Sequence, residues 1–447
     1  MSQRVVIIGA GVAGLSAART LMDNGIDDFL IVEAQDRIGG RVHTLYSENS
    51  TKILSVKHTI SSYVDGNVLE LGAQWIHGEE GNEVFELADK GNLIWNKEHG
   101  DKHSPSGASK YLNHDFCKTD GTIIDRDIVT DTCHALEDIY TDLNSCDHVT
   151  HEYQNLQDEY NARFQKLIDS NDLKGDVTEQ KRGIYRWRTA FEIHDNACYS
   201  LRDVKCPCRY TPCEGNGLVE LQNGFQSVLD TILQNVPRDK ILLNTPVKTI
   251  HWNHSSSTCR TECESGMSLI CDQVILTSSI GYLKKNHLTL FNPNLPPSKL
   301  QTIENTGYGS VLKIFLEWEM PFWSEGFTGI QFVWDCDIDN VENSKIREVD
   351  SHWSRGITGF EKLPGSGSIL LGWVGGRPAE IAESLSDEDI IDTCHKLISK
   401  FAKHLNVPRP KKVTRVLWCT LLERPPATNI SPQFMVRTSR ESGSPKK

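Results

Sequence analysis

Three glycines near the start of the chain have the spacing of a phosphate-binding turn. Gly9, Gly11 and Gly14 form the pattern G-x-G-x-x-G between an apolar run at 5–8 and a helix-like stretch at 15–21. The first glycine allows the tight turn, the second lets the backbone approach a pyrophosphate, and the third lets the helix pack on the strand. The helix would present free N–H groups to the anion. The pattern predicts a dinucleotide site.

Charged residues after this turn have the positions that a dinucleotide requires. A second apolar run at 29–32 ends in Glu33, about twenty residues beyond the glycines, where a carboxylate accepts hydrogen bonds from ribose. Arg41 follows a glycine pair and could neutralise a pyrophosphate. The alternatives are a glycine turn without a ligand and a solvated arginine. The strand–helix–strand context favours the bound dinucleotide.

Two further residues are unusual for the apolar segments that contain them. His77 lies in 70–78, whose glycines and aromatic ring predict backbone packed against a flat group, and a neutral imidazole suits proton handling. Lys313 lies in the apolar segment 309–318, where a buried ammonium needs a partner. The alternatives are a buried histidine with satisfied hydrogen bonds and an outward-facing lysine on a half-buried strand.

The remaining elements are expected to alternate between helices and strands. The segment 135–169 has the apolar spacing of helices, and Ser386 begins another helix with acidic residues in its first turn. Strands are predicted at 241–250, 274–277, 369–374 and 413–418. Glu192, in the helical region, could meet a cationic amine, but we expect a surface carboxylate.

Composition narrows the classes of partner. The 447 residues include 47 basic and 60 acidic side chains, a net charge of −13, which does not favour nucleic acid or anionic membranes. The 13 cysteines are scattered, which favours reduced thiols in a cytoplasmic protein. Four cysteines within sixteen positions could bind zinc, but their C-x-C pair lacks the usual two-residue gap, so no metal is predicted. These are Cys198, Cys206, Cys208 and Cys213.

Three segments resemble one enzyme family. The pattern E-A-x-x-R-x-G-G-R at 33–41 resembles the flavin-dependent amine oxidases, which include monoamine, polyamine and histone-demethylating oxidases. The pattern G-A-x-W-I-H-G at 72–78 is similar to the polyamine and spermine oxidase branch. The strand K-I-F-L-x-W at 313–318, followed by Phe-Trp at 322–323, is similar to the family strand that carries a lysine.

The resemblance implies an α/β fold in which a Rossmann-type (GR2-like) FAD-binding domain is interleaved with a mixed α+β substrate domain. The FAD domain would comprise 1–90 and 221–285, and the substrate domain 91–220, with its helical insertion, and 286–420. FAD would contact Gly9, Gly11, Ala13, Gly14, Glu33, Arg41, Gly72, Ala73, Gln74, Trp75 and Val247. His77 would orient the amine, and Lys313 would hold a water near flavin N5.

The implied function is that of a FAD-dependent polyamine oxidase. It would oxidise spermine, spermidine or N-acetylated polyamines with O2 to an aldehyde, a shorter amine and H2O2. The oligomeric state stays open. The resemblance ends near residue 420, and 421–447 is expected to be a divergent, disordered polar tail. The alternative is therefore a truncated, catalytically impaired relative. A chromatin demethylase is disfavoured because the chain shows no inserted coiled-coil tower.

Overall fold

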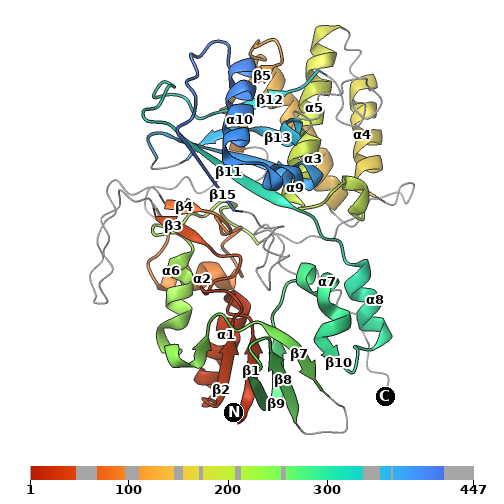
Figure 1. Cartoon of the computed structure of the whole chain (residues 1–447). Helices are drawn as coiled ribbons and strands as arrows, with labels where there is room; N and C mark the ends of the chain where they lie inside the picture. The colour runs from red at the N-terminus through yellow and green to blue at the C-terminus, as the bar shows by residue number, and fades with distance from the viewer. Residues whose placement is uncertain are drawn as a thin grey trace.

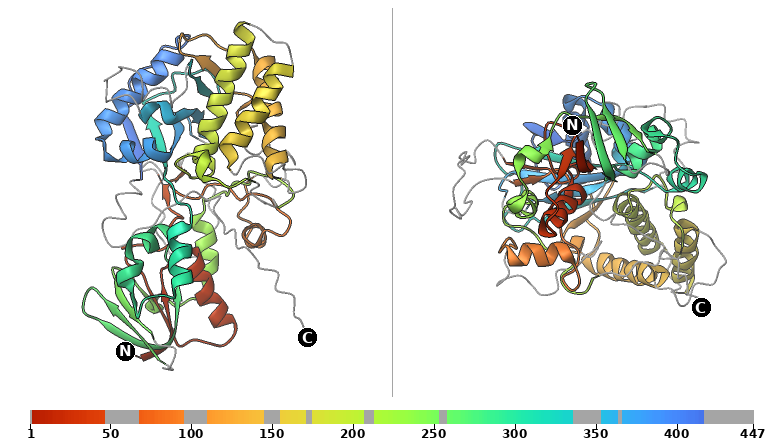
Figure 2. Two further views of the ribbon diagram at one scale, coloured as in Figure 1. Left: turned by 90° about the vertical axis from the view of Figure 1, so that its right-hand side faces the viewer. Right: turned by 90° about the horizontal axis from the view of Figure 1, so that it is seen from below.

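The computed structural model describes residues 2–46, 68–95, 110–144, 155–170, 175–206, 213–252, 258–335, 353–363 and 366–416. Its elements form two lobes, one above the other in Figure 1 and still separate when the molecule is turned (Figure 2). The predicted tail at 421–447 lies outside the described residues.

The lower lobe contains a sheet that has seven strands among the described residues, in the order β10-β7-β8-β9-β1-β2-β6. The strands are β1 (Ser2–Ile8), β2 (Phe29–Val32), β6 (Ile241–Leu242), β7 (Val247–His251), β8 (Cys259–Cys263), β9 (Ser268–Leu276) and β10 (Phe291–Asn292). Strand β1 pairs in parallel with β2 and β9. This central position explains its uninterrupted apolar sequence, because a central parallel strand is buried on both faces.

Helices cover both sides of the lower sheet. Val5 and Ile7 pack in a cluster with α1 (Val12–Asp23) and α6 (Gln226–Ile232), whereas Val6 and Ile8 pack in the cluster on the other face, because side chains alternate along a strand. Helix α2 (Glu83–Lys90) contacts α6. Helix α7 (Ile280–Leu290) lies beside β7 and β10, and α8 (Pro297–Asn305) packs on α7 (Figure 1).

The single strand predicted at 241–250 is wrong. The structure has two short strands there, and they pair with different neighbours: β6 with β2, and β7 with β8 and β10. The chain turns between them at Asn244, which has a left-handed φ of 51°. Pro246 follows, and a proline has no N–H to donate to a sheet.

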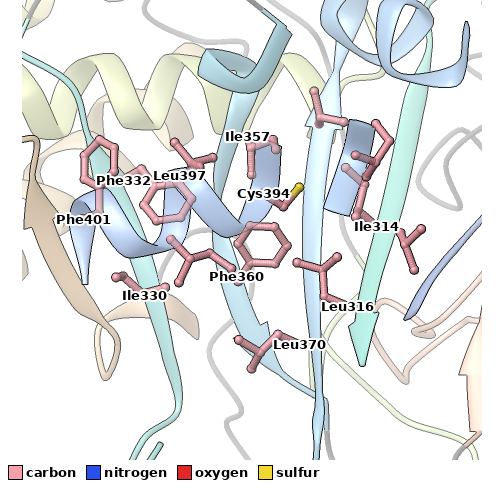
Figure 3. Close-up of a cluster of buried hydrophobic side chains, with 14 of the residues drawn as sticks. Ile314, Leu316, Ile330, Phe332, Ile357, Phe360, Leu370, Cys394, Leu397 and Phe401 are labelled. Carbon is pink, nitrogen blue, oxygen red and sulfur yellow. The ribbon is translucent and has the colours of Figure 1, made fainter. Parts of the chain in front are cut away.

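The upper lobe contains a sheet that has six strands within the described ranges, in the order β15-β11-β14-β13-β12-β5. These are β5 (Asp115–Lys118), β11 (Val311–Glu317), β12 (Gly329–Val333), β13 (Ile357–Lys362), β14 (Ile369–Gly375) and β15 (Lys412–Arg415). One face packs on α9 (Gly376–Ser384) and α10 (Asp387–Phe401). Figure 3 shows this core, where the Phe360 ring lies next to Cys394, and Ile314, Leu370 and Leu397 belong to the same cluster. Helix α10 begins at the Ser386 cap, as predicted.

The predicted helical insertion forms a layer beside the upper sheet (Figure 2). It consists of α3 (Arg126–Asn144), α4 (Leu156–Ser170) and α5 (Asp176–Asp195). The expectation that Glu192 is a surface carboxylate is wrong. Glu192 is 1% exposed, and its carboxylate lies 2.6 Å from the Arg188 guanidinium and accepts a 3.1 Å hydrogen bond from Asn196 Nδ2. A charge buried in a helical layer requires such a partner.

A small two-stranded sheet, β3 (Thr44–Tyr46) and β4 (Val68–Glu70), lies between the lobes in Figure 1. The short 3-10 helices are η2 (Leu201–Asp203), η3 (Leu233–Asn235), η4 (Arg238–Lys240) and η6 (Trp353–Gly356). The chain alternates between lobes, because the lower sheet takes strands from 2–32 and 241–292. The limits predicted for each domain stay a prediction. None of the described helices has the length and hydropathy to cross a bilayer.

Candidate active site

The glycine turn has the geometry that the sequence predicts for an anion site. Gly9 has a φ of +105°, and Gly11 is the N-cap of α1, where it offers no side chain to the first N–H groups of the helix. A Cβ on Gly14 would lie 1.9 Å from the Gly9 carbonyl oxygen, so only glycine allows α1 to approach β1 this closely. Ala13 lies exposed on the first turn of α1.

Glu33 lies at the end of β2 beside this turn. Its carboxylate accepts hydrogen bonds from the main-chain N–H of Ala10 at 2.7 Å and of Gln35 at 2.9 Å. Burial raises its pKa, and these hydrogen bonds oppose that effect. The carbonyl of Glu33 accepts a hydrogen bond from Thr245 N at 2.8 Å. This hydrogen bond brings the start of β7, which carries the buried Val247, close to Glu33.

The loop after Glu33 connects the turn to the predicted flavin segment. Gly39 N donates to the Ala10 carbonyl at 2.8 Å, and Ala73 N donates to the Arg41 carbonyl at 3.1 Å. A Cβ on Gly72 would lie 1.8 Å from the Arg41 carbonyl oxygen, so this contact also requires glycine. Arg41 itself is exposed. The first eight predicted cofactor residues therefore lie along one connected path.

Lys313 is not the outward-facing lysine of the alternative interpretation, because its side chain is buried. Strand β11 is buried on both faces, and Lys313 shares one face with Val311 and Phe315, against the segment at 69–75. Its ammonium donates three 2.8 Å hydrogen bonds, which reach the carbonyls of Glu70 and Gly72 and the Gln74 carboxamide oxygen. All three N–H groups therefore have protein acceptors.

Glu70 supports this arrangement and was missed from the sequence. Its carboxylate accepts hydrogen bonds from Phe225 N at 2.5 Å and from the Thr44 hydroxyl at 3.0 Å, just before α6. Burial raises the pKa of Glu70 and lowers that of Lys313, and the attraction between the two charges opposes both shifts. The sequence signal was its place as the first residue of the segment 70–78, in which no role was given to this carboxylate.

Two stacked indole rings, those of Trp75 and Trp373, lie beside the Lys313 ammonium. Trp75 stacks on Trp373 with ring centroids 5.9 Å apart, and the Lys313 ammonium lies 4.6 Å from the Trp373 ring centroid. Trp373 is directly opposite Lys313 in the β11–β14 register. Trp75 Nε1 donates to Glu220 Oε1 at 3.2 Å. Trp75 was predicted, whereas Trp373 and Glu220 were not, because their contacts join distant parts of the chain.

His77 continues the same segment, three residues beyond Gln74. Its main chain is fixed by Asn82, whose Nδ2 donates to the His77 carbonyl at 3.0 Å. Burial lowers the pKa of the imidazole, a main-chain hydrogen bond with Gly217 partly opposes this shift, and the Lys110 charge adds to it. His77 is therefore held neutral near physiological pH. The Lys110 charge also lowers the pKa of Lys313, after the larger effects of burial, Glu70 and Glu361.

Comparison with known proteins identifies the family. The family model for flavin containing amine oxidoreductase matches residues 12–429. The chain belongs to this family. It is 28% identical to the peroxisomal N(1)-acetyl-spermine/spermidine oxidases of Bos taurus and Homo sapiens, over 93% of this chain and 81% of each relative. It is 24% identical to polyamine oxidase 1 of Zea mays, over 93% of this chain and 78% of that protein.

Solved structures agree on the fold of this amine oxidoreductase. A redesigned putrescine oxidase superposes with a TM-score of 0.58 at 16% identity, over 94% of this chain and 85% of the other. The chain is a flavin-dependent enzyme and its cofactor is FAD. The glycine turn fits this group, because the contact of Gly14 with the Gly9 carbonyl leaves the N-terminus of α1 open to a diphosphate.

Two of the four cysteines that could bind zinc make hydrogen bonds to main-chain carbonyls instead. Cys198 Sγ donates to the Ile193 carbonyl and Cys206 Sγ to the Leu143 carbonyl, both at 3.8 Å. Cys208 lies outside the described residues. Elsewhere in the described chain, no group of three or more His, Cys, Asp or Glu side chains could hold a metal ion.

Proposed function

We propose that this amine oxidoreductase is a polyamine oxidase that oxidises spermine, spermidine or their N-acetylated forms. The observation that carries the proposal is the three-hydrogen-bond anchor of Lys313 on the segment that leads from the FAD-binding turn. The names of the bovine, human and maize relatives support the choice of substrate. With O2 and water, the products are an aldehyde, a shorter amine and H2O2.

Amine oxidation requires the substrate nitrogen to be uncharged, and a residue of the site can remove its proton. An alkylamine has a pKa of about 10.4, by analogy with lysine. His77 is kept neutral by burial, so its imidazole is available to accept a hydrogen bond or a proton from the substrate ammonium. Bound FAD would supply the two-electron acceptor for oxidation of the carbon next to the nitrogen. Trp75 and Trp373 exclude water from one side.

Lys313 is proposed to hold a water molecule beside the cofactor. Its ammonium has no spare N–H, because all three hydrogen bonds go to protein. Only one of the three acceptors is a side chain, that of Gln74. Rotation of the Gln74 carboxamide would free one N–H for water while the two main-chain carbonyls keep the ammonium in place.

The proposal includes a cytoplasmic location and no nucleic-acid partner. Nine described cysteines have free thiols, which is typical of a reducing compartment. The net charge of −13 opposes binding to nucleic acid. The oligomeric state is left open.

The test is the flavin content of the purified protein and its release of H2O2 with spermine, spermidine and N-acetylspermine. A yellow protein that produces H2O2 and aldehyde with one of them supports the proposal. A yellow protein that is inactive with all three amines contradicts it and supports the alternative of an impaired relative.

A further inference from the structure

The ammonium of Lys110 lies beside the proposed active site, in a cage formed by the Trp75 and Tyr111 rings and the Glu361 carboxylate. Lys110 Nζ lies 4.0 Å from the Trp75 ring centroid, 4.6 Å from the Tyr111 ring centroid and 3.1 Å from Glu361 Oε2. The side chains of Lys110 and Glu361 are 14% and 15% exposed. Aromatic faces combined with a carboxylate form the arrangement by which proteins recognise alkylammonium ions.

Contacts that do not involve Lys110 fix the walls of this cage. Glu361 Oε1 accepts a 3.0 Å hydrogen bond from Trp373 Nε1, and Trp373 stacks on Trp75. Trp75 donates to Glu220, and Tyr111 packs edge-on against Trp187 at 5.9 Å. The cage is therefore preorganised to hold a cation, whether or not Lys110 supplies it.

The cage adjoins Lys313 through a shared ring. Trp75 has the Lys110 ammonium 4.0 Å from its centroid and the Lys313 ammonium 6.0 Å from it. An amine substrate placed between the Trp75–His77 segment and β11 would therefore extend past Lys110. A second substrate ammonium in this cage would meet a like charge, which is strongly unfavourable in a partly buried site.

We propose that Lys110 occupies an ammonium subsite of the active site and selects amines whose corresponding end is uncharged, such as N-acylated polyamines, over fully charged polyamines. The amide oxygen of an acyl group can accept a hydrogen bond from the Lys110 ammonium, which a substrate ammonium cannot do. This inference rests on the proposed function for the identity of the amines, but its test includes binding that does not require turnover.

The test compares Lys110→Met with wild type and with Lys166→Met, a control that makes the same charge change at an exposed position of α4. Calorimetry measures the binding of spermine and N-acetylspermine to each holoenzyme after its flavin has been reduced with dithionite under anaerobic conditions, so that the bound amine is not oxidised. H2O2 release from the oxidised enzyme in air gives KM and kcat. In Lys110→Met, we expect the preference for N-acetylspermine over spermine to fall by at least about tenfold, through binding and KM. Lys166→Met should keep the wild-type preference.

A second variant distinguishes the effect of removing the Lys110 charge from a loss of folding. Lys110→Gln removes the charge but keeps a donor for Glu361, and thermal unfolding shows which variants are folded. An unchanged preference in a folded Lys110 variant overturns the proposal. If wild type binds both amines without oxidising them, the proposed function fails while the binding preference still decides the role of Lys110. If wild type binds neither amine, both proposals fail.

Discussion

The ammonium of Lys313 donates a 2.8 Å hydrogen bond to the carbonyl of Gly72, a residue 241 positions earlier in the chain. The Cα of Gly72 in turn lies against the Arg41 carbonyl, so closely that a Cβ would come within 1.8 Å of its oxygen. These two contacts join the upper sheet to the loop that leads from the glycine turn, the proposed FAD-binding turn. The proposed catalytic lysine is thus positioned relative to the cofactor site through main-chain groups.

Gly14→Ala is expected to abolish FAD binding. The added Cβ would lie 1.9 Å from the Gly9 oxygen, so α1 would move away from β1 and its N-terminus away from the diphosphate. Flavin absorbance of the purified protein should fall at least about tenfold. Gly307→Ala is the control, because no atom lies within 4 Å of its added Cβ. A Gly14→Ala protein with full flavin content would contradict this location of the cofactor.

Lys313→Met should slow flavin reduction while the flavin stays bound. The variant leaves three buried acceptors without their donor and loosens the segment at 70–74, and misplacing groups near a reacting centre by about 1 Å costs about 100-fold in rate. Anaerobic stopped-flow measurements with spermine or N-acetylspermine would follow the bleaching of the flavin. Lys248→Met, an exposed lysine on β7, should leave the rate unchanged. An undiminished rate in Lys313→Met would exclude this lysine from the chemistry.

Glu192→Gln should destabilise the helical layer. Arg188 is 1% exposed, and loss of the Glu192 charge leaves only the Glu137 carboxylate, 2.7 Å away, to balance it. Breaking a buried ion pair costs about 3–5 kcal/mol. Urea denaturation would measure this loss. The control is Glu179→Gln, an exposed ion-pair residue in the same helix, which should cost below about 1 kcal/mol.

The double variant Arg188→Met with Glu192→Leu should recover most of that loss, because it removes both fully buried charges. The Glu137 carboxylate, which loses its partner Arg188, has a side chain that is 32% exposed to solvent. If Glu192→Gln alone is as stable as wild type, Glu192 does not have the structural role that its contacts indicate.

Acidification should destabilise the protein through His194. Burial, together with a smaller effect of the Lys110 charge, lowers the pKa of this imidazole to about 3. Between that value and the usual value of about 6.5, the unfolded chain binds a proton that the folded chain does not, so the free energy of unfolding falls as the pH drops. From pH 7 to pH 4 the His194 contribution is on the order of 3 kcal/mol.

The measurement is urea denaturation at several pH values for wild type, His194→Gln and His134→Gln. His194→Gln should lose stability less steeply on acidification, whereas the exposed His134 should contribute little. Parallel pH profiles for all three proteins would show that His194 binds a proton in the folded state.

Local patterns of the sequence predicted the parts of the site that lie within single segments. The turn at Gly9 to Gly14, the carboxylate at Glu33 and the beginning of α10 depend on neighbours a few residues away, which sequence spacing reveals. Strand alternation also placed Lys313 on the opposite face from Leu312. It did not show that a second layer covers that face, and so it left open the interpretation of an exposed lysine.

The sequence by itself determined which segments carry the candidate functional groups: the glycine turn at 9–14, the segment with Trp75 and His77, and the strand with Lys313. Only the tertiary structure decided which groups meet the lysine and the indoles, namely the main chain at 70–72, the Glu70 carboxylate and the Lys110–Glu361 pair. Those contacts join segments up to 251 residues apart. The physical reason is that the packing of the two lobes determines which distant residues meet. The spacing of residues within one segment contains no information about that packing.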